Sequence, residues 1–228
     1  MGLFEGFDFA RVAVLLLKGM AVTIEVTVLS LLIALVIGLG SCLMGMSKIK
    51  PISWISKFYV WIIRGTPFIV QIFIIYFSIP QLFQAIGFRS FNISEFAAAT
   101  ATLALNAGAY ISEIFRGGIN AIDKGQMEAA RSLGLSKSRA MIKVILPQAF
   151  RISVPSLCNQ FIITLKDSSL AYTIGLAEIV FSGRQYAMST YKVFATYLMV
   201  GLAYLILITI LSAGIKAIER RLDVGNKG

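Results

Sequence analysis

Polar side chains recur at helical intervals in two apolar segments of the chain, and they are the first candidates for chemistry. The first series is Thr102, Asn106, Tyr110 and Glu113; the second is Ser153, Ser156, Gln160, Thr164 and Asp167, with Asn159 and Lys166 alongside. Polar groups in apolar surroundings are costly unless they face the interior of a helix bundle or a water-filled cavity. Both series are therefore expected to point inward, where they either line a path for a polar solute or hydrogen-bond neighbouring helices.

A second candidate segment, residues 123–147, has the local signals of two helices joined by a turn. Asp123 can cap the first helix, Gly134 can end it, and Ser136 can cap a second helix that runs to Pro147. Two adjacent alanines leave the surface of the first helix thin, which suits insertion into a groove on a partner protein. An ordinary solvated helix in a loop would show the same signals, so on their own they leave both interpretations open.

The elements that must position these residues are membrane helices. Of the 228 residues, 57% are hydrophobic and 14% are charged, a composition typical of membrane proteins. One crossing needs about 20 mostly apolar residues, and we predict five spans, at residues 20–44, 66–86, 95–115, 146–166 and 193–215. The prediction is an all-α integral membrane protein with a single transmembrane domain over residues 1–228.

Two further segments are expected to lie at the outer surface. Residues 9–17 are apolar but too short to cross, and Lys18 and Gly19 end the run, which predicts a separate interfacial helix. Residues 167–183 are polar and interrupted by glycine, which predicts a short returning helix and a loop. One face of the first span consists of small side chains, which let another helix approach closely, either within this chain or from a second copy: Ser30, Ala34, Gly38 and Cys42.

Lys and Arg residues collect on one side of the predicted spans. The richest segments are the first loop (Lys48, Lys50, Lys57, Arg64), the loop after the third span, and the C-terminal tail (Lys216, Arg220, Arg221, Lys227). Because basic residues are retained in the cytoplasm, the N-terminus is predicted to lie outside and the C-terminus inside. The net charge of +10 therefore follows from membrane topology. Nucleic-acid binding would need a basic face on a soluble module.

The chain lacks the residues of a cofactor or nucleotide site. It contains no His, its two Cys residues match no metal-ligand spacing, and it has no phosphate-binding Gly-x-x-x-x-Gly-Lys-Ser/Thr loop. We expect no cofactor, no metal and no catalytic centre, so the free energy for any uphill transport must come from a partner.

Residues 123–147 also carry a longer pattern. It reads Glu128-Ala129-Ala130, three residues, Gly134, nine residues, and then Val144-Ile145-Leu146-Pro147. This resembles the EAA loop of permease subunits of bacterial ABC importers, with Val144 in place of the usual isoleucine. The resemblance implies the type I ABC importer permease fold, with a cytoplasmic coupling loop at about 117–147 whose helices dock on the ATPase. Coupling to the ATPase is then expected of Glu128, Ala129, Ala130, Arg131, Leu133 and Gly134.

The resemblance covers nearly the whole chain and narrows to the polar amino acid branch of these permeases. The matching motifs are Arg64-Gly65-Thr66-Pro67 with Gln71 and Tyr76, Asn106 to Tyr110 with Glu113 and Arg116-Gly117-Gly118, Lys124-Gly125-Gln126, Pro147-Gln148-Ala149, Asn159, and Lys166-Asp167-Ser168-Ser169-Leu170. At Ser168 the branch more often has threonine, which keeps the hydroxyl. The implied partners are ABC ATPase subunits, an extracytoplasmic binding protein, membrane lipid and a second permease subunit, either a second copy or a related chain.

A polar amino acid presents a carboxylate and an ammonium, so its path needs opposed polar groups within an apolar wall. The candidates for this substrate pathway are Thr66, Gln71, Asn106, Tyr110, Asn159 and Gln160; a gating or structural role is expected of Arg64, Glu113, Lys166, Asp167 and Ser169. Hydrogen bonding between helices would explain the amides and hydroxyls equally well. Similarly, Arg64 could reach lipid headgroups, and Lys166 with Asp167 could form an ion pair or a helix cap.

The predicted function is the transmembrane subunit of an ABC importer that carries a polar amino acid into the bacterial cytoplasm. An ion-coupled secondary transporter is the alternative, but it would need inverted repeats or an acidic residue at mid-span, and the sequence contains neither. A membrane enzyme would need a nucleophile with a neighbouring base. The amino acid itself is left open among arginine, glutamine, glutamate, histidine and cystine.

Overall fold

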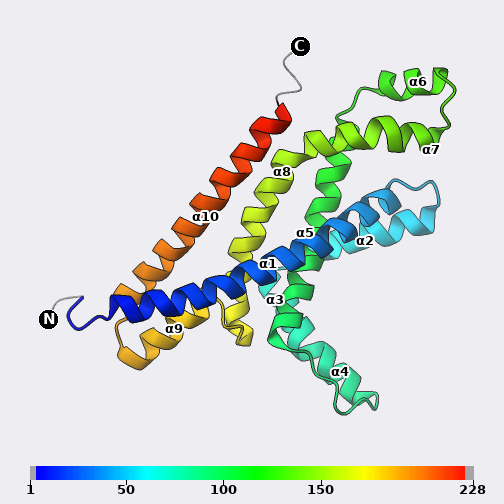
Figure 1. The fold of residues 1–228 in the computed structure, drawn as a ribbon. Helices are drawn as coiled ribbons and strands as arrows, with labels where there is room; N and C mark the ends of the chain where they lie inside the picture. Colours follow the sequence, from blue (N-terminus) through cyan, green and yellow to red (C-terminus); the bar gives the residue numbers. More distant parts are fainter. Residues whose placement is uncertain (1–3, 224–228) are drawn as a thin grey trace.

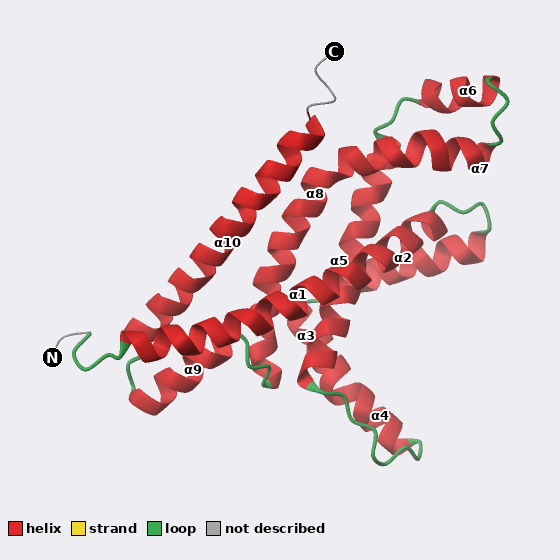
Figure 2. Cartoon of the chain, viewed as in Figure 1, coloured by secondary structure: helices red, strands yellow, loops and turns green. Residues whose placement is uncertain are grey.

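The computed structural model describes residues 4–223, with side chains up to residue 217, and this part of the chain consists of helices without strands (Figures 1 and 2). Lys227 of the predicted basic tail lies outside the described residues. The helices are α1 (Phe9–Gly45), α2 (Lys50–Gly65), α3 (Phe68–Phe73), the π-helical η1 (Ile74–Ser78), α4 (Ile79–Ala85), α5 (Glu95–Asn120), α6 (Lys124–Ser132), α7 (Lys137–Ala140), the π-helical η2 (Met141–Ile145), α8 (Leu146–Asp167), the 3-10 helix η3 (Ser168–Ile174), α9 (Ile179–Thr190) and α10 (Val193–Asp223).

Four helical stretches within residues 4–223 are long and apolar enough to cross a membrane. They are Phe9–Gly45, Phe68–Ala85, Lys137–Ile174 and Val193–Ala217, and each contains or overlaps one predicted span. The remaining predicted span, residues 95–115, lies in α5, which packs against α1, α2 and α8. Because α5 is surrounded largely by protein, it can carry Ala, Thr, Gly and Asn side chains and need not be as apolar as a helix that faces lipid.

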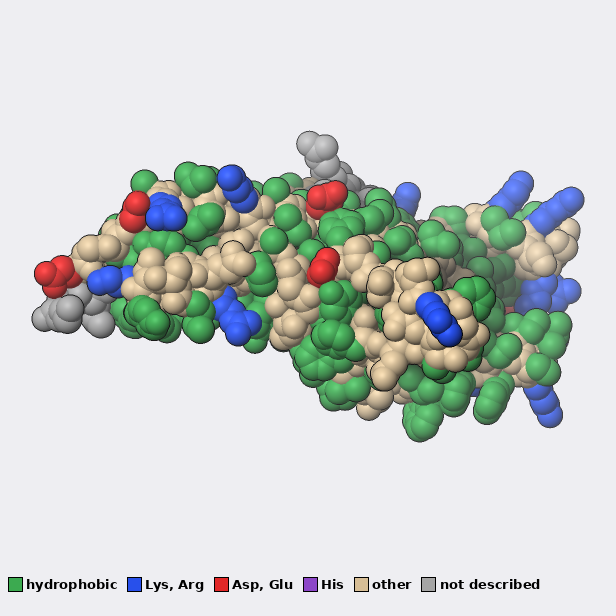
Figure 3. Space-filling model, turned by 90° about the horizontal axis from the view of Figure 1, so that it is seen from below, with side chains coloured by type: hydrophobic (Ala, Val, Ile, Leu, Met, Phe, Trp, Pro, Cys, Tyr) green, Lys and Arg blue, Asp and Glu red, His purple; other side chains and the backbone are tan. Residues whose placement is uncertain are grey.

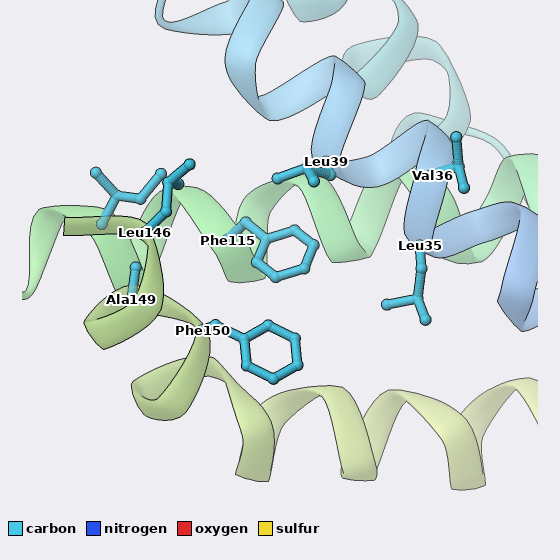
Figure 4. A pocket seen from close by; sticks show the side chains of 8 residues that line it. Leu35, Val36, Leu39, Phe115, Leu146, Ala149 and Phe150 are labelled. Carbon is cyan, nitrogen blue, oxygen red and sulfur yellow. The ribbon is translucent and has the colours of Figure 1, made fainter. Parts of the chain in front are cut away.

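Small residues allow α1 and α5 to pack closely, so the helix expected to approach the small-residue face of the first span is α5 of the same chain. Ser30, Ala34, Gly38 and Cys42 are all buried. A Cβ atom added at Gly38 would lie 2.5 Å from a side-chain carbon of Ile111 and 3.0 Å from the carbonyl oxygen of Gly108. Where α1, α5 and the start of α8 diverge, a cavity of about 370 Å³ is lined by apolar side chains that include Leu39, Phe115 and Phe150 (Figure 4).

The prediction of a separate interfacial helix at residues 9–17 is wrong, because α1 continues through Lys18 and Gly19 to Gly45. Gly19 lies at a close contact with another segment and does not end the helix. A Cβ atom at Gly19 would lie 2.8 Å from both the carbonyl carbon and the carbonyl oxygen of Glu178. Gly19 therefore lets the backbone before α9 cross the surface of α1.

The stretch between the first two predicted spans is a helix, α2, where the sequence predicts a loop. Its inner face packs through hydroxyl groups: the Ser56 hydroxyl donates to the carbonyl oxygen of Ser41 at 2.6 Å, and the Ser53 hydroxyl donates to that of Gly45 at 2.9 Å. On the same helix the Tyr59 hydroxyl donates to the carbonyl oxygen of Leu105 in α5 at 2.6 Å. Its lysines break the apolar run, which is why hydropathy alone does not predict a helix here.

The expected short helix and loop at residues 167–183 correspond to η3, a turn at Gly175 (φ +96°) and the first turn of α9. Glu178 begins α9 and is fully buried. Its carboxylate accepts hydrogen bonds from the backbone N–H groups of Val180 and Phe181, at 2.9 and 2.7 Å, and from the Tyr204 hydroxyl at 2.9 Å. Glu178 therefore ties α9 to α10, and burial raises the pKa of its carboxyl to about 7.

Candidate functional site

The predicted helix–turn–helix between α5 and α8 is present and stands at one end of the molecule (Figure 1). The Asp123 side chain caps α6 by accepting from the N–H of Gly125 at 2.6 Å. Gly134 then adopts a left-handed conformation (φ +85°), which glycine tolerates and which ends the helix. Ser136 caps α7 by accepting from the N–H of Arg139 at 3.4 Å. Capping and turn residues in this segment therefore behave as the sequence predicts.

The second helix of this motif does not stop at Pro147, which corrects the sequence prediction. Helix α7 runs through η2 into α8 without a break. In η2 the N–H of Leu146 bonds to the carbonyl oxygen of Met141, five residues earlier. This wider turn precedes Pro147, which has no N–H and would crowd the carbonyl one turn back in a regular α-helix. Helix α7 is therefore continuous with α8.

Helix α6 presents most of its predicted coupling residues to the outside. Glu128, Ala129, Arg131 and Gly134 are exposed, and Ala130 is buried, where it holds the helix to its own chain. Leu133 is 85% exposed at the end of α6, although leucine is among the residue types that are most often buried. Figure 3 shows several Lys and Arg side chains at the same end of the molecule, and further Lys, Arg, Asp and Glu side chains toward the opposite end. An exposed helix with charged and apolar side chains suits a protein partner.

Three predicted pathway residues, Thr66, Gln71 and Asn106, meet in one hydrogen-bond network. The Gln71 amide nitrogen donates to the carbonyl oxygens of Ile63 and Thr66, at 2.7 and 3.0 Å, and to the Thr66 hydroxyl at 2.9 Å. Its amide oxygen accepts from the Asn106 side chain at 2.9 Å. Gln71 and Asn106 are 7% and 8% exposed. The network therefore joins the break between α2 and α3 at Pro67 to the middle of α5.

A charged cluster lies beside this network, where α2 ends against α5. The Arg64 guanidinium lies 3.6 Å from the Glu113 carboxylate and 5.2 Å from the centre of the Tyr110 ring. Arg116 donates to both oxygens of Glu113, through Nε at 3.1 Å and through a second guanidinium nitrogen. Tyr110 is 37% exposed, and Arg64 is exposed as well. This cluster offers exposed cationic groups and a half-buried carboxylate, and an amino acid's carboxylate and ammonium would need groups of both charges.

Arg116 carries no predicted role, and the structure adds it to this cluster. Its spacing of three residues from Glu113 places both side chains on one face of a helix, so the pair could have been inferred from the sequence. The contact of Arg64 with Tyr110 spans 46 positions of sequence and has no local signal.

Among the predicted residues of α8, Gln160 and Thr164 share a hydrogen bond, whereas Asn159, Lys166 and Asp167 do not join them. Gln160 is buried and its amide donates to the Thr164 hydroxyl at 3.3 Å, whereas the neighbouring Asn159 is exposed. At the end of the helix Lys166 is exposed and Asp167 half-buried, and the salt bridges described within residues 4–217 do not include them. Ser169 lies half-buried in η3. The structure thus gives no support to an ion pair between Lys166 and Asp167.

A comparison with protein-family models finds one match over most of the chain. The family described as "Binding-protein-dependent transport system inner membrane component" matches residues 35–224. Among curated proteins, the arginine transport system permease protein ArtQ of Bacillus subtilis is 40% identical over 207 residues, covering 91% of this chain and 92% of ArtQ. The glutamine transport system permease protein GlnP of Escherichia coli K12 is 38% identical, covering 92% and 94%.

Solved structures give the same result. A structure described as an amino acid ABC transporter with histidines superposes with a TM-score of 0.86 and 37% identity, covering 94% of this chain and 98% of the other. The inward-facing MetNI methionine ABC transporter superposes with a TM-score of 0.78 at 22% identity, covering 94% and 99%. The latter similarity concerns the fold alone.

Proposed function

Because that family model covers most of its length, the chain belongs to the family of binding-protein-dependent transport system inner membrane components, and we propose that its cargo is a polar amino acid. It is the permease subunit of an amino acid ABC importer, a multi-pass inner-membrane protein that works with ATPase and permease subunits. Relatives named for arginine, cystine and glutamine transport support the choice of a polar cargo. ATP is hydrolysed in the partner ATPase.

We further propose that α6 is the element through which the ATPase moves the membrane helices. The observation that carries this assignment is the exposure of Glu128, Arg131 and Leu133 on a short helix that a turn at Gly134 joins to α7, which runs through η2 into α8 without a break. A displacement of α6 by the ATPase would be transmitted through this turn to α7 and then along one continuous helix into α8. The basic residues around α6 support its position in the cytoplasm, with the N-terminus of the chain outside.

The substrate pathway is proposed to run along the cluster of Arg64, Tyr110 and Glu113, in which Arg64 and Tyr110 are exposed and Glu113 is half-buried. Asn159, which is exposed on α8, is a candidate for the opposite wall. The buried Gln71, Asn106 and Gln160, with the exposed Thr66, would then support this wall through their hydrogen bonds. An extracytoplasmic binding protein would deliver the amino acid, and a second permease subunit, either a copy or a related chain, would complete the pathway.

The test is ATP-dependent uptake of labelled arginine, glutamine, glutamate, histidine and cystine. The assay uses liposomes that contain this chain with its ATPase and binding protein. We expect uptake of at least one of them, abolished when ATP is omitted. Uptake that needs an ion gradient and ignores ATP would instead establish the secondary transporter.

The same liposomes test the assignment of α6. Glu128→Arg should reduce ATP-dependent uptake more than about tenfold, because like charges that meet at a docking surface cost several kcal/mol, while Glu128→Gln should reduce it less. Normal uptake and normal recovery of the ATPase with Glu128→Arg would remove α6 from the coupling mechanism.

A further inference from the structure

Helix α2 carries a second face that none of the contacts above explains. Ser53 and Ser56 hold one side of the helix against α1. Side chains spaced three or four residues apart share a helix face, and the side directed away from α1 combines two cations with three aromatic rings: Lys50, Trp54, Lys57, Phe58 and Trp61. All five side chains are exposed.

The three aromatic rings of this face form a continuous column. The rings of Trp54 and Phe58 are 5.3 Å apart and nearly parallel, at 9°, and those of Phe58 and Trp61 are 5.9 Å apart at 30°. Trp54 is 66% exposed and Trp61 is 70% exposed. Tryptophan is enriched where membrane proteins meet the boundary between lipid headgroups and acyl chains, because its ring is apolar and its N–H is a hydrogen-bond donor.

The charge on this face is uniformly positive. Lys50 and Lys57 take part in none of the salt bridges described for residues 4–217. No acidic residue occurs between Glu25 and Glu95, so no local carboxylate can neutralise them. Helix α2 begins four residues after the end of the membrane-spanning α1, which places Lys50 near a membrane surface. A lysine in this position extends its ammonium toward phosphate groups.

We propose that this face of α2 binds an anionic phospholipid, with the Lys50 and Lys57 ammonium groups on the phosphate and the aromatic column along an acyl chain. The charge complementarity favours lipid over a second copy of the chain, because lysine is depleted in the cores of protein interfaces. Clusters of basic residues next to a membrane helix bind anionic lipid with a contribution from each cation. The proposal does not depend on which solute the importer carries.

The protein contains only two tryptophans, and both lie on this face. Their fluorescence therefore reports on the face alone when the full chain is reconstituted without partners. We would reconstitute it in phosphatidylcholine vesicles that contain a small fraction of either brominated phosphatidylglycerol or brominated phosphatidylcholine. Bromine quenches tryptophan fluorescence at contact. Brominated phosphatidylglycerol should therefore quench more strongly than the same fraction of brominated phosphatidylcholine.

Charge variants separate a site from general attraction. Each of Lys50→Gln and Lys57→Gln should lower the preference for phosphatidylglycerol about fivefold, and Lys50→Arg with Lys57→Arg should keep it. The control Lys18→Gln with Arg89→Gln removes two exposed cations elsewhere and should leave the preference unchanged. Equal quenching by the two brominated lipids would overturn the proposal. So would an absence of quenching by both, which would show that lipid does not contact the face.

Discussion

Gln71 illustrates how one side chain can satisfy a break between two helices. The turn between α2 and α3 leaves carbonyl oxygens without partners in the helix because Pro67 has no N–H. The Gln71 amide supplies donors to two of these oxygens and binds Asn106 of α5 with its own oxygen. The buried Gln71 amide thus holds the junction of α2 and α3 in place against α5, in an importer whose helices must move.

Gln71→Leu should therefore destabilise the protein by about 1–3 kcal/mol, the cost of leaving buried polar groups without partners. The measurement is thermal unfolding of the purified chain in detergent. Gln81→Leu, at an exposed position of α4, is the matched control and should change the midpoint little. If both variants unfold at the same temperature as the parent protein, the hydrogen-bond network does not contribute to stability.

Glu178 should make stability depend on pH. Burial raises its pKa to about 7 in the folded chain, against 4.5 ordinarily, so the folded chain holds this proton more tightly. The resulting stabilisation is fully present below about pH 4.5 and is lost as the pH rises toward 7, by about 2–4 kcal/mol in total. Glu178→Gln should flatten this part of the curve of unfolding free energy against pH; an unchanged slope in that variant would assign the effect to another group.

At the residue scale the sequence predicted helix caps and turns better than it predicted partners. Asp123, Gly134 and Ser136 act within a few residues of their own positions, so local rules suffice. Gln71 and Asn106 are 35 positions apart, and only the packing of α3 on α5 brings them together. Their assignment to the substrate pathway stays a prediction, since a polar residue in an apolar segment has the same sequence signal in either role.

At the scale of elements, the crossing of α1 by the segment before α9 depends on the absence of one side chain. Gly19→Ala would place a Cβ atom 2.8 Å from backbone atoms of Glu178, and we expect a loss of about 1–3 kcal/mol of stability from this overpacking. Gly40→Ala is the control, because nothing lies within 4 Å of its Cβ position and alanine favours a helix by up to about 1 kcal/mol. Thermal unfolding that ranks these variants in the opposite order would contradict the close approach.

Elements were predicted well where a single property decided them. The apolar runs of α3 to α4, α8 and α10 located their spans, and small residues located the face of α1 that another helix approaches, although they did not identify that helix as α5. Helix α2 was missed because its lysines lower the hydropathy of a helix that otherwise packs through Ser53, Ser56 and Tyr59. Lys18 and Gly19 predicted a helix end because glycine has the same local signal at a helix end and at a close contact.

At the scale of the whole molecule, the coupling assignment predicts a surface that matters for assembly and little for folding. Leu133→Asp should lower recovery of the ATPase with the permease by about tenfold or more, as expected for an apolar contact at the centre of an interface. The unfolding temperature of the Leu133→Asp permease should equal that of the parent protein, because Leu133 is 85% exposed. Tyr191→Asn is the control: Tyr191 is 87% exposed between α9 and α10, and asparagine accepts its left-handed backbone. Equal recovery of the ATPase with the parent protein, Leu133→Asp and Tyr191→Asn would place the docking surface elsewhere.

The length of α1 has a consequence for how the importer responds to its membrane. Its 37 residues extend about 55 Å, well beyond the roughly 30 Å of hydrocarbon in a bilayer, and Figure 1 shows it inclined to α8. A helix longer than the bilayer accommodates the hydrophobic mismatch by tilting. Lipid acyl-chain length therefore acts directly on α1, and through its close contact on α5, which holds Tyr110 and Glu113.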